Sequence, residues 1–274
     1  MLSLQITTAL LLAAPILSAQ WITYPTPGIP RLKDGSPNLA APAPRTADGH
    51  PDFSGMWAPK AVNPQCPGGL CVEQMALPVI ARNIATGQPN DQLPYQPWAA
   101  AQMKQRALDA SKDDPHVRCT PPNFPRAWAL PQYRKIIQVP DLIVVLHEFN
   151  AAYRQIHTDA RPLPQDMQPI WNGYSTARWE GSGTNQTLIV ESRGFRDDSW
   201  LDMLGNSLSS QTKVTERIRR PNFGNLEIEV TIDDPKTYTK PWTVRMDQVV
   251  VVDTEMLDEI CLENEKDAGH LTGR

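Results

Sequence analysis

The sequence lacks an excess of positive charge. Its 26 lysine and arginine residues are outnumbered by 30 aspartate and glutamate residues, which gives a formal net charge of -4 and a pI near 5.7. A broad cationic surface of the kind that binds phosphate backbones or anionic lipids needs the opposite balance. We therefore expect no nucleic-acid partner.

Several well-known catalytic motifs are missing as well. The chain contains no GxGxxG fingerprint, no glycine-rich phosphate loop with a lysine, no GxSxG elbow, no HExxH pair and no CxxC pair. These patterns place the groups that dinucleotide enzymes, ATPases, serine hydrolases and zinc proteases need. Their absence disfavours those four kinds of chemistry.

Long apolar runs are confined to the N-terminus. Residues 1–19 (MLSLQITTALLLAAPILSA) carry no charge, are apolar from Ala9 to Leu17 and end in a small residue suited to signal-peptidase cleavage. This pattern predicts a secretory signal peptide without a basic n-region. The alternative, a buried N-terminal helix, conflicts with Pro15. No other run approaches the roughly 18 residues of a membrane span, so we expect a secreted protein without a membrane partner after signal removal.

Cysteine is scarce but even in number. The four residues are Cys66, Cys71, Cys119 and Cys261, and their spacings of 5, 48 and 142 match no zinc module. An even set in a secreted chain favours disulfides. We predict a local Cys66–Cys71 pair around the CPGGLC turn and a long-range Cys119–Cys261 pair.

A glycosylation sequon is consistent with secretion. Asn185-Gln186-Thr187 lies in a stretch rich in glycine and serine. Such a sequon is modified in a surface loop of a eukaryotic secreted protein. Asn185 is therefore a predicted glycosylation site if the host is eukaryotic.

Proline is the residue in excess. The chain has 27 prolines, about twice the usual share, and 20 of them precede Gln132. We interpret residues 20–131 as a turn-rich arm with one helix, from Gln96 to Ser111. Disorder is the alternative for residues 20–50. Tryptophans set among the prolines predict an arm that packs on another surface: Trp21, Trp57, Trp98 and Trp128.

Residues 132–274 have a different texture, with short alternating or apolar runs separated by turns. Hairpin-length connections predict an antiparallel sheet that forms a sandwich or closes. We favour closure into an eight-stranded, lipocalin-like antiparallel barrel, mainly β in class, whose interior can hold one small ligand and against which the arm packs as part of one structural unit. The predicted strands are Tyr133–Val139, Leu142–Phe149, Tyr153–Thr158, Gly173–Glu180, Thr187–Arg193, Lys213–Arg219, Leu226–Ile232 and Trp242–Val251.

The alternation is clearest near the C-terminus. Leu226, Ile228, Val230 and Ile232 should share one face of a strand, with Glu227 and Glu229 on the other. The preceding run Thr215–Arg220 is rich in charge. We interpret it as a solvated strand face rather than an anion site.

A dense polar cluster, HEFNAAYRQIHTDAR, lies in the second and third predicted strands. If Asn150-Ala151-Ala152 forms a three-residue hairpin loop, Glu148 faces Arg154 and the two histidines become diagonal neighbours roughly 7 Å apart. Strand alternation then gathers His147, Phe149, Tyr153, Gln155, His157 and Asp159 on one face.

Such a face suits proton transfer, because histidine titrates near neutral pH and a carboxylate can fix its tautomer. His147, His157 and Asp159 are therefore candidate catalytic residues. The alternatives are a solvated or half-buried face and a metal site, but no HxH pair supports metal geometry. We expect no metal.

A second cluster, WNGYSTARWEG, contains two tryptophans. Alternation places Trp171 and Trp179 on one face and Tyr174, Arg178 and Glu180 on the other. The rings suit either a flat ligand or a dry core. Trp200 lies in a connection between predicted strands, where barrel loops line the mouth.

The segments RPLPQDMQPIWNGYSTARWEG, TLIVESRGFRDDSWLD and CLENEKD, preceded by APRTADGHPDFSGMW, resemble a large family of secreted, mostly uncharacterised proteins of soil bacteria and fungi. The resemblance covers nearly all of the chain after residue 19. The fungal members with a role are similar to hetero-Diels-Alderases of tropolonic sesquiterpenoid biosynthesis. These enzymes dehydrate a hydroxymethyl tropolone to a quinone methide and guide its cycloaddition to a humulene-type alkene.

The resemblance implies a cofactor-independent pericyclase whose partner is a small apolar or aromatic molecule. Dehydration needs a proton donor, which His147 or His157 could supply with Asp159 orienting it. Cycloaddition needs confinement in a dry site. The candidate substrate-binding residues are Phe149, Tyr153, Gln155, Trp171, Trp179 and Trp200. A lipocalin-like, non-catalytic binder and a metal-dependent secreted enzyme are the alternatives.

Overall fold

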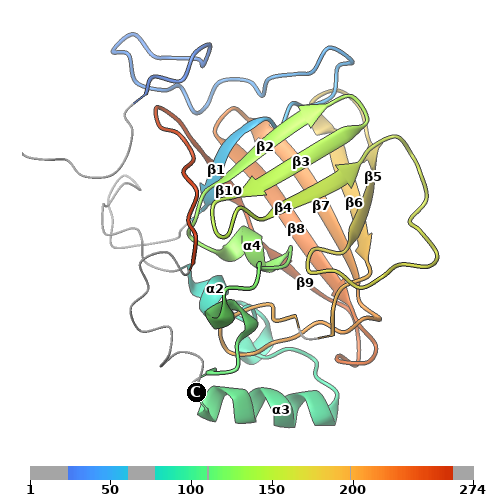
Figure 1. Cartoon of the computed structure of the whole chain (residues 1–274). Helices are drawn as coiled ribbons and strands as arrows, with labels where there is room; N and C mark the ends of the chain where they lie inside the picture. Colours follow the sequence, from blue (N-terminus) through green and yellow to red (C-terminus); the bar gives the residue numbers. More distant parts are fainter. Residues whose placement is uncertain (1–23, 61–77, 110, 198, 262–274) are drawn as a thin grey trace, which may run out of the picture.

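Nine strands close into a barrel in the computed structural model, which describes residues 24–60, 78–109, 111–197 and 199–261. Neighbouring strands are antiparallel except β4 and β5, and the ring closes where β10 pairs with both β8 and β1 (Figure 1). The strands of the sheet are β1 (Gly55–Pro59), β2 (Arg134–Val139), β3 (Leu142–His147), β4 (Tyr153–His157), β5 (Tyr174–Glu180), β6 (Thr187–Arg193), β7 (Lys213–Asn222), β8 (Asn225–Asp233), β9 (Trp242–Arg245) and β10 (Gln248–Val251).

The closed, mainly β architecture confirms the predicted barrel, with a different strand count. Strand β1 comes from the proline-rich arm and lies between β10 and β2. The predicted strand Trp242–Val251 is divided into β9 and β10, because Asp247 accepts the Ile228 amide through its side chain and interrupts the ladder. The arm therefore supplies a strand of the barrel in addition to packing against it.

Strand alternation sets the inner face. Leu226, Ile228, Val230 and Ile232 of β8 are all fully buried, as predicted, whereas Glu227 and Glu229 point outward. The solvated-face interpretation of Thr215–Arg220 is wrong in part. Glu216 and Arg220 are 1% and 3% exposed, because the alternation that buries Ile218 also buries residues two positions away.

Side chains fill the barrel, so the expectation of a ligand-holding interior is not met. The apolar inward residues of the strands form one continuous cluster with Phe124 and Trp128, and buried polar side chains such as Arg154 and Glu216 also lie inside the barrel. Helix α4 (Arg126–Ala129) lies at one end of the barrel (Figure 1) and inserts Trp128. The Trp128 indole Nε1 donates to Glu216 at 2.7 Å, which fixes this plug to β7.

The remaining helices belong to the arm and the connections. The predicted helix is present as α3 (Pro97–Leu108). Ala99 is the one buried residue of this helix, so the apolar stripe expected for it lies on the surface. The indole of Trp98 on this helix donates to the carbonyl of Lys236. The other short elements are α2 (Val79–Arg82), η2 (Pro89–Asp91), η3 (Pro115–Arg118) and η4 (Gly183–Asn185).

A disulfide joins Cys119 to Cys261, as predicted. It connects the end of η3 to residues 252–261, which we call the C-terminal strap. The predicted Cys66–Cys71 pair and the signal peptide lie outside the described residues. Asn185 is exposed at the end of η4. Among the helices that the structure describes, none has the length and apolar character needed to span a membrane.

Candidate functional site

A small depression lies beside η3, where the segments that carry Trp171 and Trp200 meet. We call it the rim depression. It encloses about 10 Å³, and about 180 Å³ when its opening to solvent is included. The enclosed part has room for roughly one water molecule. Its lining residues are Pro115, His116, Thr120, Pro121, Pro122, Asn123, Arg126, Trp171 and Trp200.

A capped turn positions His116. The Asp114 carboxylate caps η3 by accepting the His116 amide at 2.9 Å, and Pro115 occupies the first position of the turn. The same carboxylate accepts two hydrogen bonds from the Arg126 guanidinium, at 2.7 and 2.6 Å. Both side chains of this ion pair are almost completely buried. The pair therefore fixes His116 and Arg126 relative to each other.

The environment of His116 keeps its imidazole neutral. Burial lowers the pKa of His116 to about 4, and the positive charge of Arg126 acts in the same direction, against smaller opposing effects of Asp114 and the Thr120 backbone. Three buried polar atoms at the depression find no hydrogen-bond partner of good geometry among the described residues: His116 Nδ1, Thr120 Oγ1 and Arg126 Nε. Buried polar atoms are normally satisfied, so these three unpaired atoms distinguish the surroundings of the depression.

Two predicted ligand-binding residues reach the rim depression, Trp171 and Trp200. Trp171 follows Ile170, which bridges to Phe195, and precedes Gly173. Residue 173 has φ +62°, and a Cβ there would lie 2.7 Å from the Arg193 carbonyl, so the turn requires glycine.

Two side chains, Asn123 and Arg106, hold Trp200 in place. The Asn123 side chain donates to the Trp200 carbonyl at 2.7 Å. The Arg106 guanidinium lies 4.5 Å from the Trp200 ring centre, and the Arg196 guanidinium lies 4.6 Å from that of Trp171. Each indole is therefore covered on one side by a cation.

The predicted pair of histidines does not form. In the β3–β4 hairpin Gln155 lies opposite Val144 rather than His147, and Arg154 opposite Val145 rather than Glu148. The register is thus shifted by an odd number of residues, which exchanges the faces of β4 relative to β3. His147 points inward and is 1% exposed.

The other residues assigned to the same face lie on the outer surface. Tyr153, at 59%, and Gln155 are exposed, and His157 is half-buried. Asp159 is exposed and paired with Arg161, whose hydrogen bonds lower the pKa of that carboxyl. The prediction that these groups share a face with His147 is therefore wrong.

Two aromatic candidates serve the core instead. Trp179 is half-buried and packs against the core, with its ring 5.4 Å from Phe53 and stacked on His50. Trp171 lies at the rim depression instead, so the prediction that the two tryptophans share a face is wrong. Phe149 is 5% exposed, and its ring lies 4.1 Å from that of His116. Phe149 therefore supports the rim depression from behind.

His147 lies behind the same site. Its Nδ1 accepts the Phe149 amide, and burial, together with the charges of Arg134 and His116, holds the pKa of His147 well below the usual value. His147 therefore buttresses the Phe149 loop as a neutral side chain and does not line the depression.

Sequence reasoning did not identify His116, Arg126 or Asp114. The signal for the turn was the sequence Asp114-Pro115-His116, a capping residue followed by proline. Nothing local predicts that Arg126 would pair with Asp114, because Arg126 lies 12 residues further along the chain.

A second depression, of about 270 Å³, lies on the outer face of β7, β8 and β9. Its arginines are each paired with a carboxylate, in Arg217–Glu180, Arg219–Glu227 and Arg245–Asp247. Each of these arginines therefore has a carboxylate partner, and Glu229 adds a further carboxylate to the lining. The described residues also contain no group of three or more His, Cys, Asp or Glu side chains arranged to hold a metal ion.

Comparison with known proteins adds no assignment. No protein-family model matches the chain, and no curated protein matches it.

Proposed function

We propose that the protein is a secreted, cofactor-independent hetero-Diels-Alderase whose reaction takes place at the rim depression. The observation that carries this proposal is the convergence of Trp171 and Trp200 on the neutral imidazole of His116. Indole faces suit a flat conjugated ring. A neutral imidazole next to a fixed guanidinium suits proton transfer on oxygen substituents of that ring.

The dehydration step balances with one histidine. In the tautomer that leaves Nδ1 unprotonated, His116 takes the ring hydroxyl proton of a hydroxymethyl tropolone while the exocyclic C–O bond breaks. His116 then returns this proton to the leaving hydroxide, which departs as water and leaves a quinone methide. The Arg126 Nε hydrogen and the Thr120 hydroxyl, both without partners among the described side chains, would hold the ring oxygens.

Cycloaddition then depends on confinement more than on chemistry. Because the enclosed space is about 10 Å³, a substrate must displace the connections that carry Trp171 and Trp200. Connections on a rigid barrel are the elements best able to move. The Asp114–Arg126 ion pair would keep His116 and Arg126 in place while the segments that carry Trp171 and Trp200 move.

The test uses two histidine variants and a defined pair of substrates. Hydroxymethyl tropolone and humulenol are incubated with the protein, and adduct is measured against the uncatalysed background. We expect His116→Gln to lower turnover by about 10²–10⁴-fold, the usual contribution of a positioned acid or base. His157→Gln, on the outer surface, is the matched control and should leave turnover unchanged.

Each outcome of this experiment favours or refutes one of the functional hypotheses. No adduct above background with the wild-type protein would refute the pericyclase. Saturable quenching of tryptophan fluorescence by the tropolone without product would favour the alternative, a lipocalin-like or other non-catalytic binder. Loss of turnover only in His157→Gln would move the reaction to the outer face of β4.

A further inference from the structure

We propose that the Cys119–Cys261 disulfide is a redox-controlled lock, which holds the C-terminal strap against the turn that carries His116. Reduction by a dithiol would release this turn and disassemble the rim depression while the barrel stays folded. As regulation of that site, the inference depends on the proposed function, but its structural part can be tested without any substrate.

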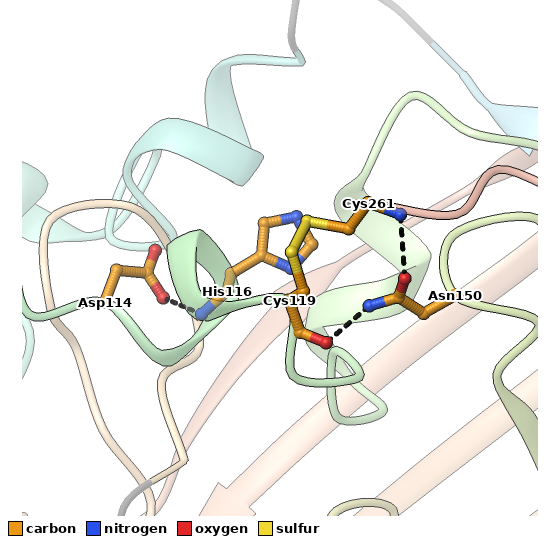
Figure 2. The surroundings of a disulfide bond; sticks show 5 residues. All are labelled: Asp114, His116, Cys119, Asn150 and Cys261. Atoms are coloured by element: carbon orange, nitrogen blue, oxygen red, sulfur yellow. Dashed lines mark hydrogen bonds between the residues drawn. A yellow bond between two sulfur atoms is a disulfide. The ribbon is translucent and has the colours of Figure 1, made fainter. Parts of the chain in front are cut away.

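The crosslink lies at the end of the functional turn. Cys119 is the C-cap of η3 and has a left-handed backbone, φ 59°, three residues after His116. Its amide donates to the His116 carbonyl at 3.0 Å. Because the disulfide fixes Cys119, it fixes the direction in which η3 ends and hence the position of the imidazole (Figure 2).

Asn150 joins the same turn to the strap without a covalent bond. Its side-chain Nδ2 donates to the Cys119 carbonyl at 2.5 Å, and its Oδ1 accepts the Cys261 amide at 3.0 Å. Figure 2 shows this side chain spanning both halves of the disulfide. The Asn150 amide group thus joins Cys119 to Cys261 through two hydrogen bonds, in parallel with the disulfide.

The strap is otherwise attached to segments other than η3. Asp253 is bonded to Thr26 and Arg31, Glu255 is bonded to Lys135 of β2, and the part nearest Cys261 is bonded to the β3–β4 loop. Leu257 donates to the Glu148 carboxylate, Glu259 donates to the Glu148 carbonyl, and Asn150 donates to the Glu259 carbonyl. After reduction these bonds keep the strap on the loop. The strap would then be linked to η3 only through the side chain of Asn150, which bonds both Cys261 and Cys119. The β3–β4 loop would also retain the ring contact between Phe149 and His116.

The redox step is a thiol–disulfide exchange that needs only a dithiol. One thiolate of the reductant attacks a sulfur, the Cys119–Cys261 bond breaks, and a mixed disulfide forms. The second thiol then releases it, which leaves two cysteine thiols and one oxidised dithiol. Cys119 and Cys261 are both half-buried residues rather than fully enclosed ones.

The position of His116 can be measured by its titration. The charged and titratable groups that act on it are Arg126, Asp114 and His147. In the oxidised protein burial holds the pKa of His116 near 4, against an ordinary value of 6.5. Release of η3 would expose the ring, so its pKa should rise toward the ordinary value.

The experiment compares two double variants by NMR of the histidine imidazole protons. Cys119→Ser/Cys261→Ser and the wild-type protein in dithiothreitol should both show His116 titrating well above 4. Cys66→Ser/Cys71→Ser is the matched control and should titrate like the oxidised wild-type protein. Near-UV circular dichroism of the barrel tryptophans reports whether the fold persists.

Three results would overturn the lock. An unchanged His116 titration after reduction would show that other contacts hold the turn. Loss of the near-UV signal together with the titration would make the disulfide a global staple. An upward shift in Cys66→Ser/Cys71→Ser as large as in the other double variant would remove the specificity of the effect.

A second variant tests the proposal if the Cys119→Ser/Cys261→Ser protein does not fold. Asn150→Asp tolerates the left-handed backbone at residue 150 but removes the donor to Cys119. We expect Asn150→Asp to make the reduced protein titrate higher than reduced wild type and to change the oxidised protein little. Equal titration of the two reduced proteins would contradict the proposal. If His116 responds but oxidised protein forms no adduct, the lock stands and the proposed reaction fails.

Discussion

Arg154 of β4 and Glu216 of β7 form a two-point ion pair inside the barrel, and each side chain is 1% exposed. The Arg154 Nη1 donates to the Glu216 Oε1 at 3.0 Å, and the second guanidinium nitrogen donates to Oε2 and to Ser192. The remaining Arg154 Nε donates to Ser175. Together with Trp128, which donates to Glu216, these groups form a buried network at the plugged end.

Removing one half of this ion pair should be costly. Glu216→Leu leaves the Arg154 guanidinium buried without its counter-charge, and we expect it to lower the free energy of unfolding by about 3–5 kcal/mol. The double variant Arg154→Met/Glu216→Leu should recover most of this loss, because no uncompensated charge remains. Urea denaturation of the three proteins tests the prediction, and a double variant as unstable as the single one would contradict it.

Trp128, which fills one end of the barrel, should stabilise the folded protein through its indole nitrogen as well as through its ring. Trp128→Phe keeps an aromatic side chain but leaves the Glu216 acceptor short of one hydrogen bond, which costs about 1–3 kcal/mol in a buried site. Trp98→Phe, at an exposed ring whose indole donates to Lys236, is the control. We expect less than about 1 kcal/mol for the control, measured by the same unfolding experiment. Equal losses would argue against the buried network.

The protein should lose stability in mild acid. The pKa of His116 is lowered to about 4 in the folded protein, so between pH 6.5 and 4 the unfolded chain binds a proton that the folded chain does not. Stability is therefore fully present above the ordinary histidine pKa and is lost as pH falls through this window, by about 3 kcal/mol. The lowered pKa of His147 acts in the same direction.

Unfolding curves at several pH values test this linkage. His116→Gln should reduce the pH dependence of the unfolding free energy, because the variant has no group to protonate at that position, and the part due to His147 should remain. The exposed-face variant His157→Gln should retain the full slope. An identical slope in wild type and His116→Gln would show that His116 does not contribute.

The Cys119–Cys261 disulfide should stabilise the whole protein in addition to the rim depression. It closes a loop with a sequence separation of 142, and native disulfides of this kind contribute about 2–5 kcal/mol, largely through the unfolded chain. We expect the Cys119→Ser/Cys261→Ser variant to unfold at lower urea concentration by that amount. A difference below about 1 kcal/mol from wild type would contradict the prediction.

The clearest strands can be predicted from this sequence because inward and outward residues alternate along them. The alternation in β8 predicts its faces, since Leu226 to Ile232 alternate with charged or polar neighbours, and the observed strand Asn225–Asp233 extends the predicted one by one residue at each end. The Cys119–Cys261 pair also follows from an even set in a chain expected to be secreted. These features depend on local periodicity and composition.

The candidate site depends on contacts between segments that local patterns do not encode. The loop between β3 and β4 is longer than expected because Glu148 and Asn150 are hydrogen-bonded to Glu259 of the strap. A register shift of an odd number of residues then reverses the faces, and His147 is separated from His157 and Asp159.

The sequence by itself therefore determined a β-rich chain, the inward positions of its clearest strands and one long-range disulfide. Only the tertiary structure decided that β1 joins the barrel, that Trp128 fills its end and that His116 meets Trp171 and Trp200. The physical reason is that hydrophobic alternation acts within one strand, whereas register, barrel filling and ion pairing depend on groups far apart in the chain, such as Arg154 and Glu216.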